Sequence, residues 1–255
     1  MRVVCLGSGN VASHMAAAFK AKGAELLQVW SRSLENAQAL AGKLGALATN
    51  DLGEVDLTAD LYLIAVKDDA IANVAEHLRG LNALVLHTSG ATSIDVLKKQ
   101  GLKQYGVLYP LQTFSKSKAL DFSKVPLCLE ADSPETLIHL QEIAGSLSPL
   151  VYNLSSDDRK IVHVAAVFAC NFTNHLYQLG QEILQHHHLD FELLKPLILE
   201  TAEKVQVASP FDVQTGPAVR NDEQTMENHL DLLKDRPDLE EIYKTLSKSI
   251  KKTYL

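Results

Sequence analysis

Residues 3–12 of the chain read VVCLGSGNVA, a short apolar run followed by the pattern G-x-G-x-x-A. The run predicts a strand, and the amphipathic stretch over residues 11–22 predicts a helix directly after the turn. In this context the first glycine allows a tight turn, the second lets the backbone approach a pyrophosphate, and the third small residue permits close helix–strand packing. A purely structural glycine turn is the alternative. The favoured interpretation is a dinucleotide site formed by Gly7, Ser8, Gly9, Asn10, Val11 and Ala12.

Short apolar runs alternate with helical patterns from this motif up to about Asn153. Strands are predicted at residues 3–6, 26–30, 61–66, 83–87, 104–108, 126–130 and 149–152. Such alternation implies βαβ crossovers and a doubly wound, mainly parallel sheet of the Rossmann type. After Ser155 only helical patterns remain, the first of them one long helix over residues 156–188. We therefore expect an α/β dinucleotide-binding domain over residues 1–153 and an all-helical domain over residues 154–255.

The composition excludes several classes of protein. The 255 residues carry 24 Lys and Arg against 31 Asp and Glu, a formal net charge of −7 that argues against nucleic-acid binding. No apolar run approaches the roughly 18–20 residues that a membrane-spanning helix needs. The three cysteines lie far apart and show no paired spacing, which predicts free thiols and a cytoplasmic location.

The end of the second predicted strand indicates which dinucleotide binds. A site for NAD usually places Asp or Glu there, about 20 residues after the glycines, to hold the ribose 2′-hydroxyl. Here the strand ends in Ser31, Arg32 and Ser33, whose guanidinium and hydroxyl groups suit a 2′-phosphate. Arg32 as a solvated loop residue is the alternative. The pattern favours NADP(H) over NAD(H).

Two further strand ends are expected to border the cofactor, because ligands of open α/β sheets lie at the carboxyl ends of the strands. One contributes Ala65, Val66 and Lys67. The other contributes Thr88 and Ser89, whose hydroxyls are candidate partners for the nicotinamide carboxamide. His87, just before them, is either a core histidine or a site residue.

Four stretches extend this pattern: HTSGA (residues 87–91), YPLQTF (109–114), the long helix with Arg159, His163 and Asn171, and TGPAVRND (215–222). Together with the fingerprint they resemble the superfamily of 6-phosphogluconate dehydrogenase, pyrroline-5-carboxylate reductase and deazaflavin-dependent NADP oxidoreductases. The closer resemblance is to a bacterial family of NADP oxidoreductases, in which a Rossmann-like domain precedes a helical domain of unknown function. It covers essentially the whole chain. It implies NADP(H) as cofactor and a helical domain like the C-terminal domain of 6-phosphogluconate dehydrogenase, but it names no reaction.

Two positions depart from what the resemblance implies. The hydroxyacid dehydrogenases of the superfamily carry a catalytic lysine four residues before an asparagine, and here that position is Val167. Tyr109 stands where we expect the family to prefer histidine. A simple β-hydroxyacid dehydrogenase is therefore disfavoured.

Four residues are candidates for the catalytic site. His163 is the first choice for a general acid or base, with Asn171 orienting the substrate, because histidine is the side chain that exchanges protons near neutral pH. On a regular helix the two lie about 80° apart. Thr215 and Arg220 form a candidate second wall, in which Arg220 binds a substrate carboxylate. The alternatives are that His163 is a core residue and that Arg220 pairs with Asp222 at the start of the following helix.

No metal site is expected, because three successive helical residues such as His186, His187 and His188 point about 100° apart. Val164, Phe168, Phe172 and Leu176 form an apolar stripe, and related helical domains pair through such surfaces, so we expect a homodimer formed by the helical domain. The predicted function is an NADP(H)-dependent oxidoreductase. It transfers hydride to or from a small anionic carbonyl or imine substrate bound between the two domains. The alternative is a non-catalytic regulator or sensor that binds NADP(H).

Overall fold

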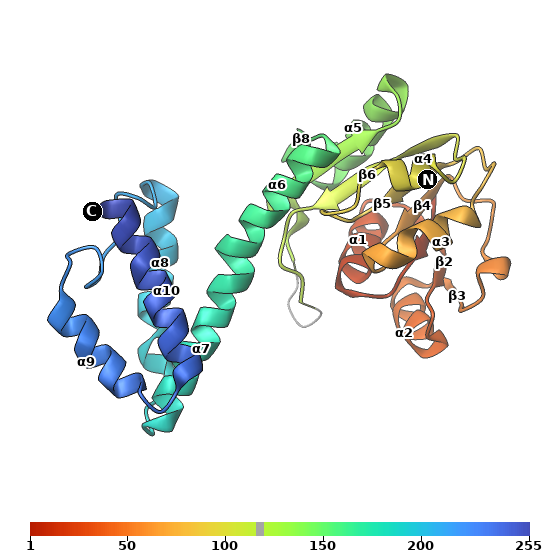
Figure 1. Cartoon of the computed structure of the whole chain (residues 1–255). Coiled ribbons are helices and arrows are strands. Elements are labelled where there is room, and N and C mark those ends of the chain that lie inside the picture. The colour runs from red at the N-terminus through yellow and green to blue at the C-terminus, as the bar shows by residue number, and fades with distance from the viewer. Residues whose placement is uncertain (116–119) are drawn as a thin grey trace. The chain divides into compact units, whose positions relative to one another are not determined.

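The structure is a computed structural model that describes residues 1–115 and 120–255 (Figure 1). The chain forms two compact units, Met1–Asn171 and Phe172–Leu255. The sheet ends at Asn153, and the first unit extends beyond it through the helix that follows. None of the helices in the described part of the chain combines the length and apolar character that crossing a bilayer requires.

The first unit contains an eight-stranded sheet with the order β3-β2-β1-β4-β5-β6-β7-β8. All neighbouring strands are parallel except β6 and β7. The order of the first six is that of a dinucleotide-binding sheet, so the expected α/β, mainly parallel fold is confirmed. The strands are β1 (Arg2–Leu6), β2 (Glu25–Trp30), β3 (Leu47–Thr49), β4 (Leu61–Ile64), β5 (Leu84–His87), β6 (Gln104–Pro110), β7 (Leu127–Ala131) and β8 (Val151–Asn153).

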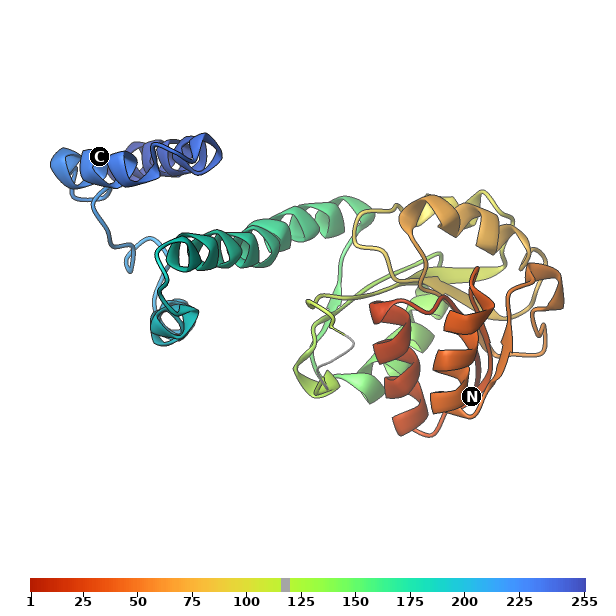
Figure 2. The same cartoon turned by 90° about the horizontal axis from the view of Figure 1, so that it is seen from below.

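Helices cover both faces of this sheet (Figures 1 and 2). One apolar core joins the sheet to α1 (Asn10–Ala21), α2 (Leu34–Leu44) and α5 (Pro134–Leu147). The other joins it to α3 (Ile71–Glu76) and α4 (Asp95–Lys98). β4 and β5 are buried along their whole length because both faces are covered.

The remaining helices begin after the sheet. α6 (Ser156–Ala166) starts at Ser155, whose hydroxyl accepts the N–H of Asp158 at 3.1 Å. The predicted single helix over residues 156–188 is interrupted by a π-helical turn, Val167–Phe172, before α7 (Thr173–His186). The second unit continues with α8 (Lys195–Val207), α9 (Glu223–Leu233) and α10 (Pro237–Tyr254).

Arg159, in the first turns of α6, is completely buried. Its Nη1 atom lies 2.5 Å from Oε2 of Glu130 on β7, and the same carboxylate accepts the hydroxyl of Ser156 at 2.7 Å. Its Nε donates to the carbonyl of Ser89 at 3.2 Å, and its Nη2 to the carbonyl of Thr92 at 2.6 Å. One guanidinium therefore joins the start of α6 to β7 and to the turn after β5.

Replacing Arg159 by Met is expected to lower the free energy of unfolding by about 3–5 kcal/mol, because it leaves the carboxylate of Glu130 without its counter-charge. Urea unfolding followed by circular dichroism measures the loss. The matched control is Lys160→Met, which removes only the exposed ion pair with Asp157 and should change stability by less than about 0.5 kcal/mol. The double variant Arg159→Met/Glu130→Met should recover part of the loss. Equal small effects of the two single changes would contradict a stabilising role of the buried pair.

Candidate functional site

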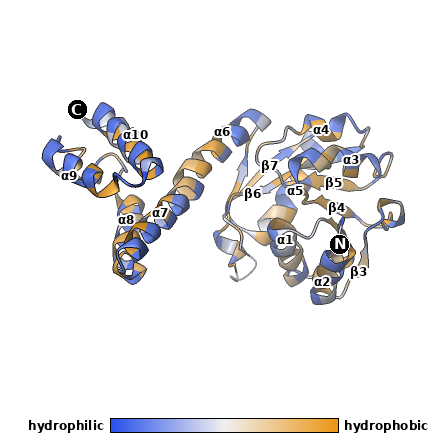
Figure 3. Cartoon of the chain, turned by 60° about the horizontal axis from the view of Figure 1, so that its bottom comes forward, coloured by the Kyte–Doolittle hydropathy of each residue, from blue (hydrophilic) through white to orange (hydrophobic). Residues whose placement is uncertain are grey.

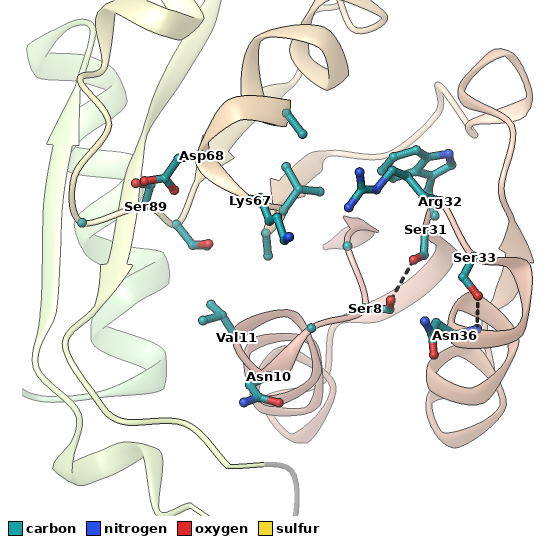
Figure 4. Close-up of a pocket in the computed structure, with 18 of the residues that line it drawn as sticks. Ser8, Asn10, Val11, Ser31, Arg32, Ser33, Asn36, Lys67, Asp68 and Ser89 are labelled. Carbon is teal, nitrogen blue, oxygen red and sulfur yellow. Dashed lines mark hydrogen bonds between the residues drawn. The ribbon is translucent and has the colours of Figure 1, made fainter. Parts of the chain in front are cut away.

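A cleft of about 650 Å³ opens at the carboxyl ends of the strands, beside the N-terminus of α1 (Figure 4). Thirteen of the fourteen residues predicted to bind the cofactor line it, the exception being Ala12, which is buried beneath it. Among the predicted catalytic residues, His163 lines the same cleft. The lining residues are Gly7, Ser8, Gly9, Asn10, Val11, Trp30, Ser31, Arg32, Ser33, Asn36, Ala65, Val66, Lys67, Asp68, Ala70, Thr88, Ser89, Gly90, Ala91 and His163.

Different physical constraints explain why the fingerprint has glycine at positions 7 and 9. Gly7 has φ +136°, and a Cβ there would lie 2.1 Å from the carbonyl oxygen of Ala65, so no side chain fits between β1 and β4. A Cβ on Gly9 would meet nothing within 4 Å and would project into open space. The bare backbone at Gly9 therefore leaves room for a bulky group close to the start of α1.

The N-terminus of α1 carries no side-chain cap. By contrast, Ser33, Ser133 and Ser155 cap α2, α5 and α6 with their hydroxyls. The first N–H groups of a helix have no intrahelical partner and carry partial positive charge, which favours an anion. An uncapped helix of 12 residues that opens onto the cleft is suited to a pyrophosphate.

The end of the cleft near β2 is rich in donors. The hydroxyl of Ser8 donates to that of Ser31 at 2.8 Å, which links the glycine turn to the end of β2 (Figure 4). Ser33 accepts the N–H of Asn36 at 3.3 Å, so its own hydroxyl proton remains for a ligand. Arg32 and Lys67 are exposed and border the cleft from the ends of β2 and β4. Arg32 and the serine hydroxyls at the end of β2 fit the phosphate that distinguishes NADP from NAD, whereas the start of α1 suits the pyrophosphate.

The opposite end of the cleft is formed by the turn after β5. The hydroxyl of Ser89 accepts the N–H groups of Ala91 and Thr92, at 3.1 and 2.9 Å, and donates to the hydroxyl of Thr92 at 3.0 Å. Its proton is therefore used within the turn, and Ser89 shapes the cleft through its backbone. Thr88 donates to the carbonyl of Ile64 at 3.5 Å.

His87 lies in the core rather than on the cleft. It is fully buried, and its Nδ1 accepts the N–H of Ser89 at 3.2 Å. Burial, followed by the positive charge of Arg159, lowers the pKa of His87 to about 3, so the ring is neutral at physiological pH. The alternative of a core histidine is the one that the structure bears out.

His163 extends from α6 to the cleft and meets Tyr109 from the end of β6. The Tyr109 hydroxyl lies 3.1 Å from Nδ1 of His163. Gly90 packs against both, since a Cβ there would lie 2.7 Å from Cζ of Tyr109 and 2.8 Å from Nδ1 of His163. Sequence reasoning noted Tyr109 only as a departure from the family pattern and missed this contact, because the two residues are 54 positions apart.

Of the other three predicted catalytic residues, one lies at the end of the first unit and two lie in the second. Asn171 is exposed in the π-helical turn, where hydrogen bonds run from i to i+5, so the angle of about 80° expected for a regular helix does not apply. Thr215 and Arg220 are exposed in the second unit. Asp222 caps α9 by accepting the N–H of Thr225 at 3.1 Å. No group of His, Cys, Asp and Glu residues in the described ranges could hold a metal ion.

Two protein families match the chain. Residues 2–87 match the family described as "NADP oxidoreductase coenzyme F420-dependent", and residues 125–250 match a domain of unknown function, DUF2520. No curated protein matches the chain.

Solved structures match over almost the full length. A protein from Bacteroides fragilis named "putative NADP oxidoreductase" is 43% identical, with 98% of each chain covered and a TM-score of 0.94. An imine reductase from Myxococcus stipitatus in complex with NADP+ is 16% identical, covers 99% of this chain and 93% of its own, and gives a TM-score of 0.68. A 1-pyrroline-5-carboxylate reductase from Streptococcus pyogenes is 15% identical, with 99% and 98% covered and a TM-score of 0.67. The last two show the fold alone.

Replacing Arg32 by Ala is expected to weaken NADPH binding about 10–100-fold, as expected when a charge-assisted contact to phosphate is lost. Binding of NADH, which lacks that phosphate, should stay unchanged. Titration of the fluorescence of Trp30, which lines the cleft and is the only tryptophan, measures both affinities. Arg79→Ala, an arginine outside the cleft, is the matched control and should leave both unchanged. The same ratio of the two affinities in Arg32→Ala and in the parent would show that Arg32 does not select the cofactor.

Proposed function

Because the chain belongs to the family in which an NADP oxidoreductase domain precedes a DUF2520 domain, we propose that it transfers hydride between NADP(H) and a small anionic substrate. The substrate is of the carbonyl or imine type and binds between the two domains. The oxidoreductase role and the cofactor are those of the family. The substrate class and its binding place are the proposal, as is a cytoplasmic location.

The proposal rests on one observation: residues suited to the cofactor and a histidine line the same cleft. The uncapped start of α1, Arg32 and Lys67 border this cleft, and His163 lines it as well. A dinucleotide placed with its phosphates at the helix start can extend along the strand ends toward the turn with Ser89 and Gly90. A group that can give or accept a proton therefore lines the cleft that also suits the cofactor.

Reduction of a C=O or C=N bond needs a hydride at carbon and a proton at oxygen or nitrogen. The bound nicotinamide supplies the hydride chemistry. His163 supplies the proton: a charged imidazole releases it from Nε2, the ring nitrogen that Tyr109 does not contact, and is left neutral. The reverse transfer returns the proton to the ring during oxidation.

His163→Ala is expected to lower kcat at least about 100-fold, as is typical when a general acid is lost, with NADPH affinity unchanged. The assay follows NADPH consumption with a panel of small imines and keto acids that carry a carboxylate, and Trp30 fluorescence reports binding. His139→Ala, an exposed histidine on α5, is the matched control. Tight NADPH binding without turnover on any member of the panel would favour the regulator. Val167, which stands where the hydroxyacid dehydrogenases carry their catalytic lysine, also favours that alternative. Equal turnover of His163→Ala and the parent would remove His163 from the mechanism.

The second unit supports a further part of the proposal, a homodimer formed by the helical domain. Among residues 172–255, all of which the structure describes, the buried hydrophobic side chains are Ala218, Met226 and Leu239. Large apolar side chains such as Leu193, Leu197 and Val207 are 65%, 62% and 87% exposed. Ile161 and Val164 on α6 are also more than half exposed. Figure 3 shows hydrophobic stretches along α6 and α7. Surfaces this apolar are typical of subunit interfaces.

Replacing Leu197 or Val164 by Glu is expected to convert the dimer to monomer, because each places a charge in an apolar interface. Light scattering coupled to size-exclusion chromatography measures the mass at micromolar protein concentration. Ile138→Glu on α5, a 59% exposed apolar residue outside the helical surface, is the matched control and should leave the dimer intact. A parent protein of 27.9 kDa in solution would contradict the dimer outright.

A further inference from the structure

The contact between Tyr109 and His163 brings together two elements that are distant in sequence. Tyr109 lies near the end of β6 and His163 in the middle of α6, and the Tyr109 hydroxyl is 3.1 Å from Nδ1. The two rings meet edge to face, with centroids 6.1 Å apart and planes at 70°. Tyr109 is half-buried and is not among the residues lining the cleft, whereas His163 is. We therefore expect Tyr109 to influence a ligand in this cleft through His163.

The phenol of Tyr109 is suited to hold the imidazole in both of its charge states. Burial raises the pKa of Tyr109 to about 12, with Cys128 contributing and Arg159 opposing, so the hydroxyl stays protonated. A protonated hydroxyl both donates and accepts. It accepts from Nδ1–H both when the ring is charged and when the ring is neutral after Nε2 has released its proton, and it can donate to Nδ1 in the other neutral tautomer. The hydrogen bond between Tyr109 and His163 is therefore kept when the imidazole gains or loses a proton, and the ring need not flip.

The turn after β5 packs against both Tyr109 and His163 through Gly90. No side chain fits at position 90, since a Cβ there would lie 2.7 Å from Cζ of Tyr109 and 2.8 Å from Nδ1 of His163. The carbonyls of Ser89 and Thr92, on either side of Gly90, are held by the buried guanidinium of Arg159. Arg159 precedes His163 by four residues, about one turn of α6. The His163 ring is therefore contacted by the phenol of Tyr109 and the backbone of Gly90, and Arg159 anchors the helix that carries it.

We infer that Tyr109 is a positioning residue, which fixes the His163 ring with Nδ1 toward β6 and Nε2 toward the cleft throughout proton transfer. This rests on the proposed acid–base role of His163. Nε2 is then the nitrogen that exchanges its proton with the substrate, and Nδ1 keeps its hydrogen bond to the phenol. Gly90 contributes by leaving the contact between the two rings unobstructed.

The test uses the full-length protein with ¹⁵N-labelled histidine rings, observed by NMR with and without NADP+. Tyr109→Phe removes the hydroxyl and keeps the ring. Tyr105→Phe, on the same strand and outside the pair, is the matched control. Gly90→Ala separates the pair by bulk, and its control is Gly145→Ala, where a Cβ meets nothing within 4 Å. His163→Gln assigns the His163 signals.

In the parent, NADP+ is expected to shift the Nε2 signal of His163 more than the Nδ1 signal. Tyr109→Phe and Gly90→Ala should shift Nδ1, and in both variants NADP+ should shift the two nitrogens alike, because the ring then adopts both orientations. Both controls should reproduce the parent. Once a substrate is in hand, Tyr109→Phe should lower kcat about 10-fold with the KM for NADPH unchanged, a loss of roughly 1.4 kcal/mol in transition-state stabilisation.

Two results would overturn the inference: His163 signals that Tyr109→Phe leaves unmoved, or a larger response of Nδ1 than of Nε2 to NADP+ in the parent. Failure of the proposed function looks different. In that case no member of the substrate panel is turned over, or His163→Ala turns one over as fast as the parent, while the shift of Nδ1 in Tyr109→Phe is still observed in the free protein.

Discussion

The site depends on one buried charge, the guanidinium of Arg159. Placing a cation in the core costs several kcal/mol unless each donor finds a partner. Here the partners come from three places, the carboxylate of Glu130 on β7, the carbonyls of Ser89 and Thr92 after β5, and the hydroxyl of Ser156 on α6 itself. Because a strand, a turn and a helix must all be in place to satisfy the charge, the ion pair specifies how α6 leaves the sheet.

The two ends of the cleft are built by different means. The phosphate end uses backbone: the uncapped start of α1, Gly7, where no side chain fits, and Gly9, which leaves open space. Side chains at the ends of β2 and β4 complete it. The opposite end is formed by the turn after β5 and by His163 of α6, which Tyr109 of β6 contacts beside Gly90. A backbone cradle suits a cofactor shared by many proteins, whereas a side-chain pair can change with the substrate.

This difference explains what the sequence could and could not predict. The fingerprint at Gly7 and Gly9 is local, because strand, turn and helix start are consecutive. Its residues from Gly7 to Val11 line one cleft, and Ala12 is buried beneath it. The parallel sheet follows from similarly local patterns, except for the three-residue strand β3, which the sequence analysis does not predict. The pair of Tyr109 and His163 has no local signal, since the two residues lie 54 positions apart in different elements. The π-helical turn at Val167–Phe172 is likewise invisible to a 3.6-residue period, which is why the expected relation of His163 and Asn171 does not hold.

The helix that carries His163 also carries part of the proposed dimer surface. On α6, Arg159 is buried and His163 lines the cleft, while Ile161 and Val164 are 69% and 56% exposed. Residues two and one positions away on a helix point about 200° and 100° apart, so the two roles occupy different faces of the same two turns. A helix held on one face by the Arg159 cluster and on the other by a second subunit cannot roll without losing contacts on both. Association through this surface would therefore restrain the helix that carries His163, whereas Tyr109 would orient the ring on that helix.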